Sequence, residues 1–147
     1  MNRSISITLQ ADLAYTRVIS SFAGQVAEMF AGETGSSGNI AEFCHAFELS
    51  ASESFTNSVR YGDPADSSRG ITVDFTTEGD RLTLKVTDTN SGFDPSPPAP
   101  DISTYPEKGY GLFIIARLMD DVSYSRVDGK NTLSMTKQVL RAATEIQ

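Results

Sequence analysis

Glu53 and Asn57 are the first residues in the sequence whose types and spacing could support chemistry. They lie four residues apart in the segment ESFTNSVRY, so on a helix they would share one face. A carboxylate and an amide on one face could orient a water or hydroxyl group and ligate magnesium through the amide oxygen. Spacing alone favours a different interpretation, a solvated polar stripe, because the pair lies nearly opposite Ala51 and Phe55.

Two later segments place acidic and glycine residues where a ligand could lie. Asp88 ends an alternating run and opens TNSGFD, where a carboxylate could reach a ligand from a sheet edge and Gly92 would permit close backbone approach. Gly109 and Gly111 then open an apolar stretch, so the amides of a helix N-terminus could face an anion. Lone aspartates are more often turn formers and such glycines more often serve packing, so neither segment is decisive alone.

Hydrophobic periodicity predicts the elements of the first half. Alternation at Ile5, Ile7 and Leu9 predicts a half-buried strand over residues 4–9, and Asp12 is suited to be a helix N-cap. A helix is expected over residues 13–31, with apolar residues at Tyr15, Val18, Ile19, Phe22, Val26, Met29 and Phe30. A second is expected over residues 40–61, with a buried stripe of Ile40, Phe43, Cys44, Phe47, Ala51, Phe55 and Val59.

The second half predicts a hairpin, an irregular segment, a short helix and a second hairpin. Alternating residues over 71–75 and 82–86 flank an EGD turn, and the prolines that follow forbid regular structure before an apolar helix over 111–119. A strand over 122–127, a DGKN turn and a strand carrying Leu133, Met135 and Val139 complete the chain. This order predicts a single domain over residues 1–147, a two-layer α/β sandwich with helices on one face of a mixed, mostly antiparallel sheet.

Composition narrows the class of protein. A formal net charge of −7 argues against a protein that grips a nucleic-acid backbone through Lys and Arg. No apolar run approaches the roughly 20 residues of a membrane span, and the N-terminus lacks the pattern of a signal peptide. Cys44 is the only cysteine, which excludes an internal disulfide. We therefore expect a cytoplasmic protein whose partners are neither free nucleic acid nor membrane.

Taken in order, the three segments resemble the N, G1 and G2 boxes of the GHKL superfamily of ATPases and kinases, whose fold is the Bergerat fold. The resemblance covers almost the whole chain and is nearest to RsbW-type anti-sigma factor serine kinases. In those proteins ESFTNSVRYG, SGFDP, GYGLFIIARLMDDVSY and NTLSMTK have recognisable counterparts. The resemblance implies ATP and Mg²⁺ as cofactors. It also implies a homodimer formed through the first strand and helix, and a sigma factor or a STAS-type antagonist as partner.

Carried over residue by residue, the resemblance also implies roles. Glu53 would be the general base that activates the attacking hydroxyl or water, and Asn57 would coordinate magnesium. Asp88 would accept a hydrogen bond from the adenine amino group, while Gly92 would let the base lie against the backbone. Gly109 and Gly111, with the helix they open, would cradle the phosphates, and a lid would extend from about residue 96 to residue 108. The cradle residues are Lys108, Gly109, Tyr110, Gly111 and Leu112.

The chain departs from the family pattern in three places. Asn90 stands where the G1 box usually has a glycine, and asparagine tolerates positive φ better than other residues. Asn131 aligns with a threonine of the last motif, although a one-residue offset would place Thr132 there instead. The lid holds no arginine, so a charge that stabilises the transferred phosphoryl group must come from Lys108 or Arg60, or there is none.

These features predict an ATP-binding anti-sigma regulatory factor that acts in transcription regulation. The leading hypothesis is a serine/threonine protein kinase that phosphorylates an anti-anti-sigma antagonist. The alternative is a nucleotide-dependent module that sequesters a regulatory partner without phosphoryl transfer, which the missing lid arginine favours. A third possibility is a degenerate fold that binds partners without nucleotide.

Overall fold

The computed structural model describes residues 2–35, 38–62, 66, 69–90 and 108–139, with backbone only for residues 108–110. The elements follow the predicted order, with one short 3₁₀ helix added before the first α-helix. Their bounds are β1 Ser4–Gln10, η1 Leu13–Tyr15, α1 Thr16–Glu33, α2 Ile40–Arg60, β2 Gly70–Glu78, β3 Arg81–Asp88, α3 Lys108–Leu118, β4 Asp121–Val127 and β5 Lys130–Gln138.

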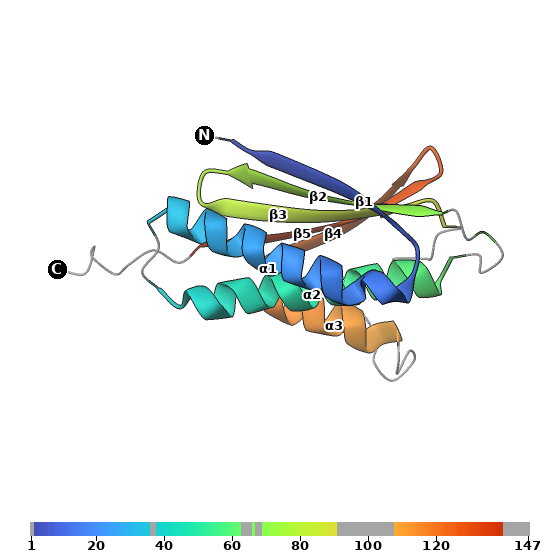
Figure 1. Ribbon diagram of the computed structural model, residues 1–147, viewed down its shortest axis with the longest axis horizontal. Coiled ribbons are helices and arrows are strands. Elements are labelled where there is room, and N and C mark those ends of the chain that lie inside the picture. The colour runs from blue at the N-terminus through green and yellow to red at the C-terminus, as the bar shows by residue number, and fades with distance from the viewer. Residues whose placement is uncertain (1, 36–37, 63–65, 67–68, 91–107, 140–147) are drawn as a thin grey trace.

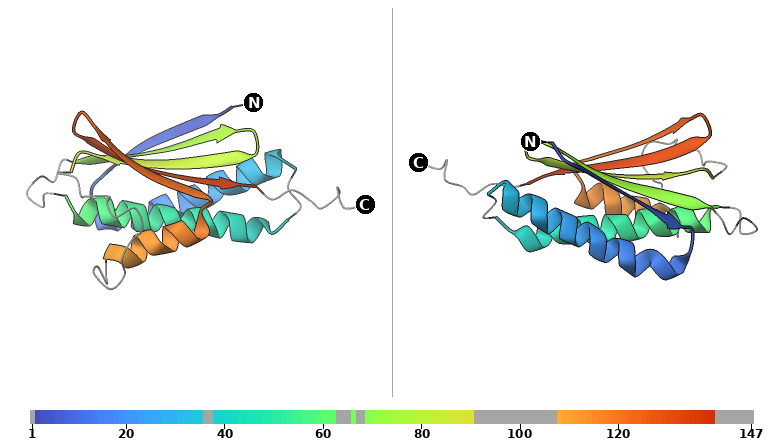
Figure 2. Two further views of the ribbon diagram at one scale, coloured as in Figure 1. Left: turned by 180° about the vertical axis from the view of Figure 1, so that it is seen from behind. Right: turned by 45° about the horizontal axis from the view of Figure 1, so that its top comes forward.

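The strands form one sheet in the order β1-β2-β3-β5-β4, and α1, α2 and α3 lie together against one of its faces (Figures 1 and 2). Every strand pairing among the described residues is antiparallel, so the mixed sheet expected from the sequence is antiparallel throughout. The chain forms two hairpins, β2-β3 and β4-β5, and the second inserts β5 beside β3. This pairing sets Asp88 at the end of β3 directly opposite Asn131 near the start of β5.

The core lies between the sheet and the helices. The residues of β2 and β3 that the alternation predicted to be internal are buried, because successive side chains in a strand point to opposite faces. On α2, Phe43, Phe47, Ala51 and Phe55 are buried in the same core, as the helical period predicted. The buried face of α2 is therefore fixed against the sheet, which determines the direction of its other faces.

The first helix differs from its prediction. Asp12 caps the 3₁₀ helix η1 by accepting a hydrogen bond from the amide of Ala14, whereas α1 itself follows Tyr15 without a side-chain cap. Ile19, Val26 and Phe30 are buried as expected, whereas Tyr15, Val18 and Met29 are exposed. The apolar residues of α1 occupy two neighbouring faces, and the face that packs in the core also contains the small residues Ala23, Gly24, Ala27 and Ala31.

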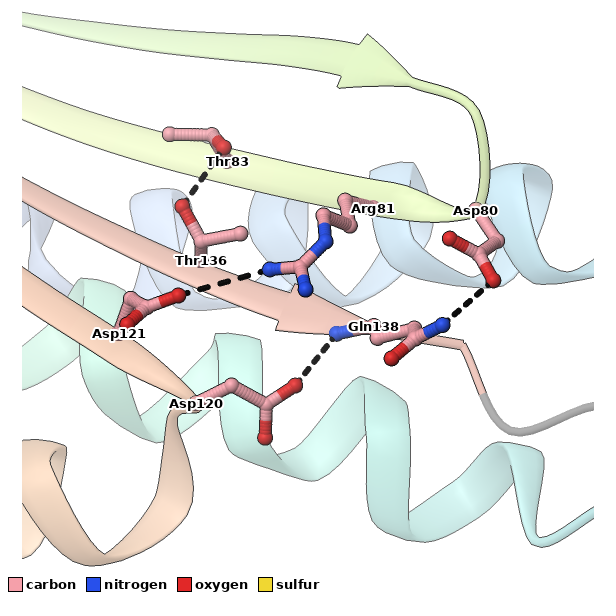
Figure 3. Close-up of polar contacts among 7 residues, drawn as sticks. All are labelled: Asp80, Arg81, Thr83, Asp120, Asp121, Thr136 and Gln138. Atoms are coloured by element: carbon pink, nitrogen blue, oxygen red, sulfur yellow. Dashed lines mark hydrogen bonds and ion pairs between the residues drawn. The ribbon is translucent and has the colours of Figure 1, made fainter.

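Polar contacts anchor α3 and the far end of the sheet. Lys137 Nζ donates to the carbonyl of Leu118, the last residue of α3, at 2.8 Å. Figure 3 shows the neighbouring network, in which the backbone amide and side-chain amide of Gln138 donate to Asp120 and Asp80. In the same view Arg81 pairs with Asp121 at 3.4 Å. These contacts are at the end of β3 opposite to Asp88.

The helix predicted over residues 111–119 begins three residues earlier, at Lys108, so Gly109 and Gly111 lie within its first turn. In the described part of the chain, no helix combines the length and apolar character that a membrane crossing requires.

Candidate functional site

Glu53 and Asn57 lie side by side on α2 and face the first turn of α3 at Gly111. A Cβ atom placed on Gly111 would lie 3.0 Å from Glu53 Oε1 and 3.2 Å from Asn57 Nδ2. Both polar side chains are half-buried, and Gly111 is buried. The interpretation of this pair as a solvated stripe is therefore wrong, because α3 covers the face of α2 that carries it. A glycine at position 111 is what allows the carboxylate and amide to approach the α3 backbone this closely.

Asp88 lies at the end of β3 and accepts hydrogen bonds from three protein groups. Its Oδ1 accepts from the backbone amide of Asn90 at 3.1 Å and from Asn131 Nδ2 at 2.8 Å. Its Oδ2 accepts from Ser58 Oγ at 2.7 Å. A carboxylate has about four acceptor positions, two on each oxygen, so one position on Oδ2 is unfilled by the described residues.

Ser58 joins the two halves of the site. It follows Asn57 on α2, and its hydroxyl reaches the Asp88 carboxylate across to β3. The neighbourhoods of Glu53, Gly111 and Asp88, which are widely separated in sequence, therefore meet along the last two turns of one helix. Ser58 did not stand out in the sequence, because a serine next to an asparagine gives no signal until the strand opposite it is known.

Asn90 acts through its side chain, and the conformational reason expected for it is wrong. Among the described non-glycine residues only Asp128 has a positive φ, so Asn90 does not use the left-handed conformation. Instead its Nδ2 donates to the carbonyl of Ser58 at 2.8 Å, and its Oδ1 accepts from Arg69 Nη1 at 2.9 Å. The side chain is 7% exposed, so these bonds satisfy a buried amide.

Asn131, and not Thr132, is the residue beside Asp88. Its Nδ2 donates to Asp88 and to the carbonyl of Asn90, while its Oδ1 accepts from Tyr124 and Arg126. All four hydrogen-bonding positions of the amide are therefore filled by protein groups. The hydroxyl of Thr132 instead pairs with Thr87. Asn131 thus orients Asp88 and has no hydrogen-bonding position left for a ligand.

Arg69 is a further residue of the site that the sequence did not reveal. Its guanidinium donates to Asn90 and to the carbonyls of Ser58 and Val59 at the end of α2. A Cβ atom on Gly62 would overlap this guanidinium, so the glycine after the second helix makes room for Arg69. The available signal for this contact was the Tyr61-Gly62 pair at the end of ESFTNSVRYG. Its partner Arg69 lies in a turn-rich segment that has no hydrophobic periodicity.

The remaining candidate residues divide between described and undescribed parts of the chain. Gly92 and residues 96–107 of the expected lid lie outside the described residues. Lys108, Gly109 and Tyr110 are placed by their backbone in the first turn of α3, and Leu112 follows half-buried in the same helix. Arg60 is exposed at the end of α2, seven residues after Glu53 and hence on nearly the same face.

Proteins similar to this chain include serine-protein kinases named RsbW. The chain is 33% identical over 100 residues to the serine-protein kinase RsbW of Bacillus licheniformis, a match that covers 61% of this chain and 62% of the relative. It is 31% identical over 101 residues to serine-protein kinase RsbW of Listeria monocytogenes, covering 63% of this chain and 64% of that one. The matches thus span somewhat less than two thirds of these relatives' length.

A solved structure with the same fold contains the RsbU and RsbW domains of Rv1364c from Mycobacterium tuberculosis. It is 22% identical, superposes with a TM-score of 0.61, and the match covers 95% of this chain and 33% of that one. The two-layer antiparallel fold is therefore that of the GHKL and RsbW proteins. Residues 9–137 match the family described as the histidine kinase-like ATPase domain. This range is most of the sequence and includes every residue described above for the site. On this match, the chain belongs to the histidine kinase-like ATPase domain family.

Proposed function

We propose that this chain binds ATP with magnesium and acts as an anti-sigma regulatory factor that phosphorylates a serine or threonine of a STAS-type antagonist. The observation that carries the proposal is the joint placement of three residues on α2. Ser58 donates a hydrogen bond to Asp88, and Glu53 and Asn57, earlier on the same helix, face Gly111. One short stretch of α2 thereby connects the Asp88 carboxylate, suited to recognise the adenine base, with the first turn of α3, suited to hold phosphates. The matches to serine-protein kinases support the same activity.

In this proposal the nucleotide lies along the end of α2. The unfilled acceptor position of Asp88 takes a hydrogen bond from the adenine amino group. The phosphates lie at the first turn of α3, where backbone amides and the helix dipole favour negative charge. Glu53 is then placed to accept the proton of the attacking hydroxyl, because its carboxylate lies at Gly111 in that turn.

Magnesium fits this site as an ion that binds together with the nucleotide. The described residues contain no group of three or more acidic, histidine or cysteine side chains able to hold a metal ion. Magnesium is commonly bound through few protein ligands together with phosphate oxygens and water. The side-chain oxygen of Asn57, positioned beside Gly111, would supply the protein ligand, and the bound metal would neutralise charge on the phosphates.

The same proposal includes a cytoplasmic location. It also includes a homodimer formed through α1. Tyr15, Val18, Phe22 and Met29 follow one another at spacings of three, four and seven residues, which places them in one stripe along the helix. Val18 is 50% exposed and Met29 38% exposed, and neither contributes to the core. A self-complementary partner would bury this stripe against its own copy.

A second candidate function is a module that binds nucleotide and a sigma factor or antagonist but transfers no phosphate. It is supported by the absence of arginine from residues 91–107 of the sequence. In such a module Arg60, on the face of α2 that carries Glu53, would hold the phosphates without assisting transfer.

The two functions separate in a transfer assay. The chain is incubated with γ-labelled ATP, magnesium and a STAS-type antagonist from the same source organism, and labelled antagonist is measured. Glu53→Gln is expected to abolish transfer while keeping ATP affinity, because it removes the base and retains the shape of the side chain. Glu28→Gln, at an exposed position on α1, is the matched control and should transfer like the unchanged chain. Tight ATP binding with no labelled antagonist would refute the kinase and leave the binding module.

A further inference from the structure

Two arginines lie on either side of Asn90, and neither forms an ion pair with a described carboxylate. Arg69 Nη1 donates to the side-chain oxygen of Asn90 at 2.9 Å, and Arg126 Nη1 donates to its backbone oxygen at 2.9 Å. Within the described ranges, the ion pairs involve Arg3, His45 and Arg81 only. Toward the described residues, both guanidinium groups donate only to uncharged oxygens, an arrangement that positions groups rather than neutralises charge.

Arg69 ties Asn90 to the end of α2. Besides Asn90 it donates to the carbonyls of Ser58 at 3.5 Å and Val59 at 3.3 Å, which a positive charge near a helix C-terminus favours. Ser58 is the residue whose hydroxyl donates to Asp88. The same Ser58 carbonyl accepts from Asn90 Nδ2 at 2.8 Å, so Arg69 reinforces a direct contact between this donor and Asn90.

Arg126 ties Asn90 to the strands on the other side. Its Nη1 also donates to Asn131 Oδ1, which accepts a second bond from the Tyr124 hydroxyl at 2.8 Å. With its oxygen occupied by these two donors from β4, the amide can present only its NH₂ group to Asp88. Arg126 and Tyr124 therefore set which end of the Asn131 amide faces the carboxylate.

Each donor to Asp88 among the described residues is thus contacted by at least one of the two arginines. Arg69 donates to the carbonyl of Ser58 and Arg126 donates to Asn131. Both contact Asn90, Arg69 at its side-chain oxygen and Arg126 at its backbone oxygen. We propose that Arg69 and Arg126 are positioning residues for base recognition, which orient the Asp88 carboxylate so that its one unfilled acceptor position faces the amino group of adenine. The proposal rests on the proposed nucleotide site and adds to it two residues that do not touch the ligand.

This positioning predicts that loss of either arginine weakens only the recognition of the adenine amino group. Adenine carries an exocyclic amino group that donates to an acceptor, whereas purine riboside triphosphate has hydrogen there and is otherwise the same molecule. If the arginines act through Asp88, their removal weakens binding of ATP and leaves binding of the analogue nearly unchanged. A general loosening of the fold would weaken both ligands together.

The test is calorimetric titration of Arg69→Met and Arg126→Met with ATP and with purine riboside triphosphate, each in the presence of magnesium. The dissociation constant for ATP should rise about three- to tenfold, the range of one well-formed hydrogen bond, while that for the analogue changes less than about twofold. Arg81→Met is the matched control, because Arg81 is also an exposed arginine on the sheet but lies at the opposite end (Figure 3). It should leave both constants unchanged.

Three results would overturn the proposal. Equal weakening of ATP and analogue by both variants would assign the arginines to folding alone, and unchanged ATP affinity in both would remove their role. If the unchanged chain binds ATP no better than the analogue, Asp88 does not recognise the amino group, although ATP binding itself stands. Failure of the unchanged chain to bind either ligand would instead refute the proposed function. Arg126 is exposed, so its variant provides the test even if Arg69→Met unfolds.

Discussion

Substitution of Gly62 by alanine is expected to destabilise the chain by displacing Arg69. The added Cβ would overlap the guanidinium, which must leave its hydrogen bonds to Ser58, Val59 and Asn90. Each such bond contributes about 0.5–1.5 kcal/mol, or about 1.5–4.5 kcal/mol for three. Alanine restricts the unfolded chain and offsets about 0.4–1 kcal/mol of this loss. The expected net decrease in the free energy of unfolding is about 1–4 kcal/mol, which lowers Tm by about 3–12 °C for a chain of this size.

The assay is thermal and urea unfolding of Gly62→Ala beside a matched glycine variant. Gly32→Ala lies in the last turn of α1, where an added Cβ meets no atom within 4 Å. It should stabilise the chain by about 0.5–1 kcal/mol through helix propensity. In an Arg69→Ala background, Gly62→Ala should cost less than about 0.5 kcal/mol, because the overlapping group is gone. A cost that persists in that background, or no cost in the unchanged chain, would refute the reasoning.

Three further predictions concern other parts of the molecule. Gly111→Ala places a methyl group 3.0 Å from Glu53 Oε1, so calorimetry should show ATP affinity reduced at least about tenfold, and an unchanged affinity would contradict the role of this approach. Burial first, and then two neighbouring glutamates, raises the pKa of the Cys44 thiol. Its alkylation by iodoacetamide should therefore accelerate at higher pH in the folded chain than in urea, and coincident profiles would count against this. Val18→Asp, at an exposed position of α1, should change Tm by less than about 2 °C yet convert a dimer to a monomer in sedimentation, whereas a persisting dimer would exclude this face.

The order and type of the elements could be predicted because their patterns have one dominant period. Buried and less buried side chains alternate along the strands that contain Val73 and Leu84, and the apolar residues of α2 form a single stripe that is buried in the core. The prediction failed where a helix has apolar residues on two faces. In α1 the alanines and Gly24 pack closely in the core, and Val18 and Met29 on the adjacent face remain exposed.

The site was predicted as three separate motifs, and the structure shows how they meet. Glu53 and Asn57 could be paired from helical spacing, but their approach to Gly111 depends on where α3 packs. Asn90 and Asn131 were candidate residues from the sequence, but their bonds to Asp88 could not be predicted, because they depend on the register of β3 against β5. The third donor, Ser58, gave no signal. A local rule explained Asn90 by its tolerance of positive φ, whereas long-range hydrogen bonds explain it in the fold.

Because Glu53, Asn57 and Ser58 belong to one uninterrupted helix, α2 fixes the distance and the angle between the two ends of the site. The first and the last are five positions apart, about 7.5 Å along the axis at the usual helical rise. Substitutions elsewhere can adjust either end of the site independently, but a single residue inserted or deleted between them would swing one end about 100° around the axis relative to the other. The length of this short stretch is therefore less tolerant of change than the identity of most residues within it.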